Sequence, residues 1–303
     1  MIDIQDILDD ALAKIRAGYV FPDKVDAVDA AIRRRLTDGS YQGLAGPELC
    51  EAVTAHIQEA CPDKHLRLLW NEEPLPREND DSPEEVRARW AAVFRADNYG
   101  IRRVEQLDGN IGYLDLRSIP GAAEGGRAFA AAMELLAHTE ALIIDLRHCR
   151  GGAPDGVALW CSYLFPDGEV HLNDIYDRAT DSTRQFWTSA HVPGTRYADR
   201  PVYVLTSDFT FSGGEELAYN LQVNGRATLV GETTRGGAHP TERFAVTEHI
   251  TVTVPTARSI NPVTGTNWEG VGVVPDVAVP AGEALVQAIA DALDRVRVGA
   301  AAR

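Results

Sequence analysis

Apolar residues recur every three or four positions through about the first sixty residues of the chain. Such spacing places them on one face of a helix, and it predicts amphipathic helices at residues 4–18, 22–39 and 46–61. Gly, Pro or Asp occupies the breaks between these segments, as is typical of helix ends. Three short helices in succession predict a small N-terminal bundle.

A polar, proline-containing segment follows at residues 71–85, and it predicts a linker. A helix is expected after it, at about residues 83–96. From residue 101 onward the pattern changes to short β-prone apolar runs that alternate with helical segments.

The expected strands and helices of this second part alternate along the chain. Strands are predicted at 109–119, 141–147, 201–207, 227–232 and 249–260, and helices at 125–138, 154–165 and 213–223. Such alternation predicts an α/β layer structure, in which ligands gather at the carboxyl ends of the strands. The predicted organisation is a helical bundle at 1–72, a linker and helix at 73–100, and an α/β core at 101–303.

Charge and composition narrow the range of expected partners and locations. The formal net charge of −16 would repel nucleic-acid phosphates and anionic lipid, so neither nucleic acid nor a membrane surface is an expected partner. The N-terminal segment lacks the basic start and apolar run of a signal peptide, and no apolar stretch approaches the ~20 residues of a membrane span. We therefore expect a cytoplasmic protein.

The four cysteines are Cys50, Cys61, Cys149 and Cys161. They form no CxxC pair and have no matching histidine spacing, so a zinc site is not expected. No other metal and no cofactor is expected. Reduced thiols are the expected state in the cytoplasm.

One stretch, TSDFTFSGGEELAYNLQ at residues 206–222, places Ser212 between a β-prone run and a helix. Serine is a favoured helix N-cap, and Glu215 three residues later completes a capping box. A helix N-terminus also suits a nucleophile, because its free backbone amides can bind an oxyanion, and Gly213 leaves them accessible. The stretch by itself leaves both alternatives open.

A second glycine pair occurs in LIIDLRHCRGGAPDG, residues 142–156. A strand ends there, and Gly151 and Gly152 lead into a helix, which is a geometry that offers further backbone donors to a developing negative charge. Asp145 and Arg147 are expected to brace the end of the strand.

These two motifs occur in order with VGETTRGGAHP and NWEGVGVVPDV. The set resembles the S41 peptidase family of C-terminal processing proteases, tricorn core proteases and interphotoreceptor retinoid-binding-protein repeats. The upstream segments GYVFPDKVDAVDAAI, GSYQGL and DKHLRLLW are similar to the helical region of the retinoid-binding-protein branch. The resemblance implies a crotonase/ClpP-like sheet-and-helix core with an N-terminal three-helix bundle, and no PDZ insertion is recognised.

The resemblance also implies which residues act. Processing proteases use a lysine where this chain has Gly237, and the only lysines are Lys14, Lys24 and Lys64, all before the α/β core. The tricorn branch uses a histidine and a glutamate, and His65 and Glu269 stand at the matching places.

The implied roles are Ser212 as nucleophile, His65 as general base and then acid, and Glu269 as the carboxylate that orients the imidazole directly or indirectly. The oxyanion hole would be formed by backbone amides of Gly213 and of Gly151 or Gly152.

This chain departs from the family pattern at two positions. Lys64 stands where tricorn proteases have a serine, so Glu269 pairs with Lys64 or reaches His65 by another route. Cys149 replaces an asparagine of the oxyanion motif, and a thiol nucleophile there is the minor alternative to Ser212. His148 and His239 flank glycine turns and are further candidates to line the site.

A serine peptidase acting through an acyl-enzyme is the favoured function, on short peptides or a small acyl substrate. The aromatic segment 174–197 is expected to line the cleft. The alternatives are a non-catalytic lipid or retinoid carrier, and an esterase, lactonase or cyclase using the same acyl-enzyme. The sequence leaves the oligomeric state open.

Overall fold

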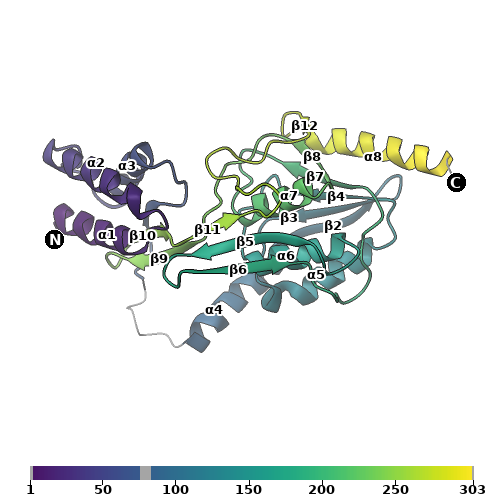
Figure 1. Ribbon diagram of the computed structural model, residues 1–303, viewed down its shortest axis with the longest axis horizontal. Coiled ribbons are helices and arrows are strands. Elements are labelled where there is room, and N and C mark those ends of the chain that lie inside the picture. The colour runs from purple at the N-terminus through teal and green to yellow at the C-terminus, as the bar shows by residue number, and fades with distance from the viewer. Residues whose placement is uncertain (1–2, 76–82, 302–303) are drawn as a thin grey trace. The chain divides into compact units, whose positions relative to one another are not determined.

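The computed structural model describes residues 3–75 and 83–301, which form a mixed α/β protein (Figure 1). These residues group into two compact units, called here the first and the second unit. The first unit comprises the described residues of Met1–Val86, Ile175–Arg184 and His239–Ser259. The second comprises the described residues of Arg87–Asp174, Gln185–Ala238 and Ile260–Arg303. The domain boundaries expected at residues 72 and 100 stay predictions.

The first unit contains the three predicted helices. They are α1 (Ile4–Gly18), α2 (Val25–Thr37), which follows the short 3-10 helix η1 (Pro22–Lys24), and α3 (Gly46–Ala60). Their apolar faces are buried, with Ile15, Val28 and Ile57 at most 1% exposed. The N-terminal helical group expected from the apolar spacing is therefore confirmed.

A three-stranded antiparallel sheet completes the first unit, in the order β1-β10-β9. Its strands are β1 (Arg67–Trp70), β9 (Thr241–Ala245) and β10 (Ile250–Pro255). Val252 and Val254 of β10 are fully buried and share one apolar core with the three helices. Strands that are far apart in the sequence thus pack with the three helices.

The second unit is built on a six-stranded sheet in the order β12-β8-β7-β4-β3-β2 (Figure 1). The strands are β2 (Ile101–Leu107), β3 (Ile111–Leu116), β4 (Ala141–Asp145), β7 (Val202–Thr206), β8 (Thr228–Gly231) and β12 (Val277–Ala278). All neighbours are parallel except β2, which is antiparallel to β3. The carboxyl ends of the parallel strands therefore meet at one edge.

Helices cover both faces of this sheet. They are α5 (Ala122–Leu136), α6 (Pro154–Leu164), α7 (Gly213–Val223) and α8 (Ala284–Ala301). The alanines Ala284, Ala288 and Ala292 of α8 pack on one face, in a cluster with Ile143 and Leu205. The alternation of strands and helices, and the α/β fold it predicts, are confirmed.

Besides β1, β2, β9 and β12, three further strands were not expected as separate elements. They are β5 (His171–Asp177), β6 (Ser182–Trp187) and β11 (Ala257–Ile260), which form a second three-stranded sheet in the order β11-β5-β6. The predicted strand at 249–260 is two strands, because β10 ends at Pro255 and β11 begins at Ala257.

The linker expected at 71–85 lies partly outside the described residues. Between β1 and β2, the described part of the chain contains only α4 (Pro83–Ala96), as predicted, and the short η2 (Asn98–Gly100). No described helix has the length and apolar character needed to cross a membrane.

Candidate active site

Ser212 lies in the turn between β7 and α7, directly before the first residue of the helix. Its backbone has φ 52° and ψ −122°, a conformation that glycine adopts readily and that costs other residues about 1–3 kcal/mol. Because strain of this kind is retained where function requires it, the conformation favours a reactive serine over a cap alone.

Glu215 holds this turn in place. Its carboxylate accepts a hydrogen bond from the Ser212 amide at 2.9 Å, which is one half of the predicted capping box. The same carboxylate accepts from Thr234 Oγ1 at 2.5 Å and from the amides of Gly236 and Gly237 at 2.6 and 2.8 Å. Glu215 therefore joins the serine turn to the TTRGG loop.

The side chain of Glu215 is fully buried. Burial raises its pKa above the usual value, and the four donors act in the opposite direction because they favour the carboxylate. The capping pattern predicted the contact with Ser212, but nothing local in the sequence indicated the three contacts with the distant loop.

The two glycine pairs singled out in the sequence meet in the second unit. A Cβ atom on Gly151 would lie 2.6 Å from the Gly213 nitrogen and 2.8 Å from Ser212 Cβ, and one on Gly213 would lie 2.7 Å from the Gly152 nitrogen. Only glycine allows the loops to approach so closely. A hydrogen bond from the Phe211 amide to the Cys149 carbonyl, 3.1 Å long, also ties them together.

The amides at this contact differ in their partners. Gly151 donates toward the Cys149 thiol, whereas the Gly152 and Gly213 amides donate to no protein acceptor in the described part of the chain. Of the three predicted oxyanion donors, the geometry therefore favours Gly152 and Gly213. Their role stays a prediction.

Cys149 is fully buried beneath this loop, with its Sγ 3.0 Å from the place of a Cβ on Gly214. Burial raises the pKa of its thiol to about 12, although the Gly151 amide opposes this. A thiol with so high a pKa supplies almost no thiolate at neutral pH, which argues against the alternative of a cysteine nucleophile.

Asp145 and Arg147 brace the end of β4, as expected. The Arg147 guanidinium donates to both oxygens of Asp145, at 2.9 and 2.6 Å, and the Tyr113 hydroxyl donates to the same carboxylate at 2.6 Å. Arg147 also donates to the Ala281 carbonyl at 2.7 Å, which anchors the start of the segment leading to α8.

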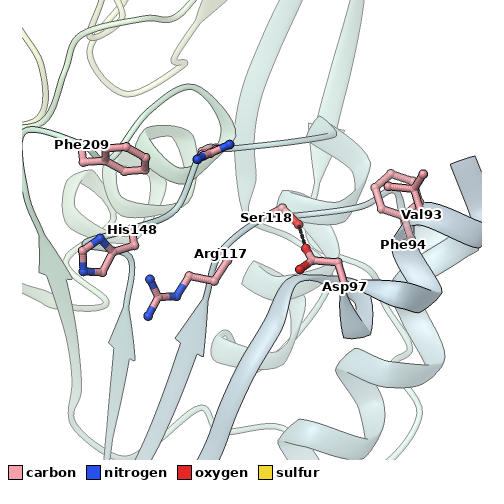
Figure 2. Close-up of a pocket in the computed structure, with 8 residues that line it drawn as sticks. Val93, Phe94, Asp97, Arg117, Ser118, His148 and Phe209 are labelled. Atoms are coloured by element: carbon pink, nitrogen blue, oxygen red, sulfur yellow. Dashed lines mark hydrogen bonds between the residues drawn. The ribbon is translucent and has the colours of Figure 1, made fainter. Parts of the chain in front are cut away.

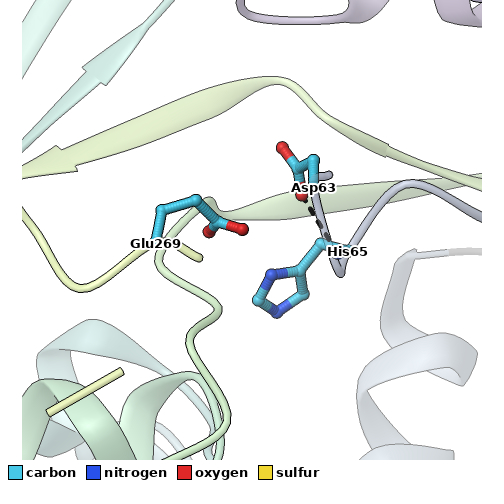
Figure 3. Close-up of side chains that lie close together, drawn as sticks. All are labelled: Asp63, His65 and Glu269. Atoms are coloured by element: carbon cyan, nitrogen blue, oxygen red, sulfur yellow. Dashed lines mark hydrogen bonds between the residues drawn. The ribbon is translucent and has the colours of Figure 1, made fainter. Parts of the chain in front are cut away.

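His65 belongs to the first unit, in the turn between α3 and β1 (Figure 3). Its amide donates to Asp63 Oδ1 at 3.0 Å, and its carbonyl accepts from Thr253 Oγ1 at 2.5 Å. Only 8% of the residue is exposed. The backbone on both sides of the imidazole is therefore fixed, as a positioned general base requires.

Asp63 also binds a second histidine. Its Oδ2 lies 2.7 Å from His239 Nδ1 and accepts from the Tyr19 hydroxyl at 3.1 Å, all within the first unit. Burial alone would raise the pKa of Asp63, but His239 and the His65 amide lower it. His239 was a candidate to line the site, whereas no sequence pattern pointed to Asp63 or Tyr19.

Glu269, also drawn in Figure 3, belongs to the second unit. Its Oε2 accepts from the Ala238 amide at 2.5 Å, directly beyond the glycines that Glu215 holds. The neighbouring Trp268 donates from Nε1 to the Gly237 carbonyl at 2.9 Å. The expectation that Glu269 orients His65 stays a prediction.

Within the second unit, the structure therefore brings Ser212, Gly213, Gly151 and Gly152 together. Glu269 binds Ala238, the residue that follows the glycines held by Glu215.

Glu216 is a buried acid that sequence reasoning missed. It is 4% exposed, and Asn173 Nδ2 donates to it at 3.2 Å. Burial raises its pKa to about 8, so the group is mostly protonated at neutral pH, while the Asn173 bond weakly opposes the shift.

Replacing Glu216 by glutamine is expected to flatten the pH dependence of stability. The folded-state pKa is raised from 4.5 to about 8, so the stabilising contribution is complete below pH 4.5 and is lost as the pH rises through 8. Denaturant unfolding at several pH values should show wild type losing up to a few kcal/mol relative to Glu216→Gln across this window. Glu124→Gln, at an exposed glutamate, controls for charge; parallel curves for wild type and Glu216→Gln would show that Glu216 is ionised throughout.

Comparison with known proteins shows which family the chain matches. The model of peptidase family S41 matches residues 110–279. The chloroplastic carboxyl-terminal-processing peptidase 2 of Arabidopsis thaliana is 31% identical over 275 residues, which are 88% of this chain and 47% of the relative. A carboxyl-terminal-processing protease of Synechocystis is 29% identical over 176 residues, 56% of this chain and 38% of the relative.

The solved structure of a photosystem II D1 C-terminal processing protease has the same fold, with a TM-score of 0.52 and 14% identity over 92% of this chain and 94% of that one. The chain belongs to peptidase family S41. It spans about half the length, or less, of the curated relatives it matches. The more specific likeness to the retinoid-binding-protein branch stays a prediction.

Proposed function

We propose that the protein is a serine peptidase that cleaves peptides through an acyl-enzyme on Ser212. The observation that carries this proposal is the strained backbone of Ser212 in contact with the Gly151–Gly152 loop. Membership of a peptidase family supports the same function.

In the proposed reaction, His65 takes the hydroxyl proton of Ser212 as the oxygen attacks the peptide carbonyl. The amides of Gly213 and Gly152 stabilise the oxyanion, and the imidazolium then returns the proton to the leaving amine as the C–N bond breaks. Water resolves the ester by the same steps, again with His65 as base.

His65 is the favoured base for two reasons. The chain has no lysine after Lys64, so a lysine from the α/β core is excluded. The fixed backbone of His65 also suits an imidazole that must come within ~3 Å of the serine oxygen. Glu269 is the proposed carboxylate partner of the imidazolium.

Intact-mass spectrometry after treatment with a fluorophosphonate tests the activated serine. Wild type is expected to gain one adduct, and Ser212→Ala and His65→Ala to gain none over the same period, because the hydroxyl is a poor nucleophile without its base. His56→Ala, at the other histidine of the N-terminal region, is the matched control and should label as wild type does.

A folded wild type that stays unlabelled would contradict the proposal and favour the carrier alternative. Labelling without peptide cleavage, but with hydrolysis of chromogenic esters, would favour an esterase.

A further inference from the structure

A cavity of about 480 Å³ opens in the second unit at the edge of the sheet that carries Ser212 (Figure 2). It is lined by Val93, Phe94, Asp97, Arg117, Ser118, His148, Arg150 and Phe209. Its volume is in the range of roughly 300–1,000 Å³ that is usual for small-ligand pockets.

The lining comes from the carboxyl ends of three neighbouring parallel strands. Arg117 follows β3, His148 and Arg150 follow β4, and Phe209 follows β7. Ligands of open α/β sheets bind at such ends. The end of α4 closes the cavity on another side, where Figure 2 shows Phe94 and Asp97.

Two residues that line the cavity are close in sequence to the two loops of the candidate active site. Arg150 directly precedes Gly151, and Phe209 lies three residues before Ser212. The hydrogen bond from the Phe211 amide to the Cys149 carbonyl holds these two loops side by side. The loops that carry Ser212 and Gly151 therefore also contribute Phe209 and Arg150 to the lining of the cavity.

The charged side chains that line the cavity differ in whether they already bind a polar group of the protein. Arg117 donates to Asp115 at 2.7 Å, and Asp97 accepts from the Ser118 hydroxyl at 3.4 Å. Arg150 is exposed, forms no ion pair with any carboxylate in the described residues, and lies over the Phe209 ring at 5.6 Å. The ring orients the guanidinium without neutralising it.

We propose that this cavity is a subsite for a carboxylate group of the substrate, bound by Arg150 with His148 beside it. A guanidinium binds a carboxylate through paired hydrogen bonds, and Phe209 and Phe94 supply apolar surface for the carbon chain that bears it. The carboxylate belongs either to an acidic side chain or to the C-terminus of a peptide. That the bound carboxylate belongs to a peptidase substrate rests on the proposed function.

Binding to the Ser212→Ala variant tests the subsite without requiring catalysis. The probes are acetyl-Ala-Phe-Glu-amide, acetyl-Ala-Phe-Gln with a free C-terminus, and the neutral acetyl-Ala-Phe-Gln-amide, with Kd measured by calorimetry. At least one acid is expected to bind about tenfold more tightly than the neutral peptide, as a charge-assisted hydrogen bond implies. The peptide that binds more tightly shows whether the carboxylate comes from an acidic side chain or from a C-terminus.

Arg150→Gln, added to Ser212→Ala, is expected to remove this preference and leave the neutral peptide's Kd unchanged. Arg127→Gln, which removes an exposed arginine from α5, is the matched control and should keep the preference. Equal binding of all three peptides, or a preference that survives Arg150→Gln, would overturn the subsite. Failure of Ser212 labelling in the wild type would instead count against the proposed peptidase and leave this binding result standing.

Discussion

Replacing Ser212 by glycine is expected to abolish peptide cleavage while producing a protein more stable than the corresponding alanine variant. Either substitution removes the nucleophile and should lower kcat/KM by roughly 10⁴–10⁶-fold. Only glycine adopts φ 52° and ψ −122° without strain, so Ser212→Gly should exceed Ser212→Ala in unfolding free energy by about 1 kcal/mol, after its extra entropy in the unfolded chain.

Denaturant unfolding of both variants and hydrolysis of one fluorogenic peptide measure these effects. Ser207→Ala is a useful activity control, because this serine lies in the same loop and donates to the Arg147 carbonyl at 2.5 Å. It should lose stability but retain most of its activity. Equal stability of the glycine and alanine variants would show that the Ser212 turn stores no strain.

Replacing Glu215 by alanine should have the largest effect on stability, and it should also slow the reaction of Ser212. The amides of Ser212, Gly236 and Gly237 would lose their acceptor inside the protein. At about 1–3 kcal/mol for each of these three buried unsatisfied groups, the loss should total about 3–9 kcal/mol. Misplacement of the serine turn should slow fluorophosphonate labelling by about a hundredfold.

The neighbouring buried acid supplies the matched control for Glu215. Glu216→Gln keeps a hydrogen-bonding group of the same size, and at neutral pH Glu216 is mostly protonated, so this variant should remain stable and label normally. If Glu215→Ala labels as fast as Glu216→Gln, then the contacts of Glu215 do not position the nucleophile.

The sequence predicted the elements whose periodicity is regular. α1, α3 and α7 begin and end within a residue of the predicted bounds, because their apolar spacing and their Gly, Pro or Ser boundaries are local signals. β6 has one buried residue among exposed ones, so it carries no alternation to detect. α8 was not predicted. Alanine forms much of its buried face, and alanine is a weak indicator of an apolar face.

The candidate site was predictable to the same extent. Motif order pointed to Ser212 and both glycine pairs, and the structure brings those glycines together. The pair of Asp63 and His239 joins residues 176 positions apart, and no local pattern encodes such a contact. Glu215 was recognised only as a cap, because its link to Gly236 also forms across a loop of the chain.

The first unit is made of segments that are far apart in the sequence, and this determines the order in which its parts are synthesised. Helices α1–α3 precede most of the second unit in the sequence, whereas β10, which pairs with β1 and completes their core, and β9, which pairs with β10, follow it. The apolar core that these helices share with β10 therefore stays incomplete until Ile250, Val252 and Val254 have been synthesised. Because the turn that holds His65 depends on Thr253 and His239, its geometry is completed at the same late stage. A nascent chain of this protein thus acquires a positioned His65 only after most of the second unit has been synthesised.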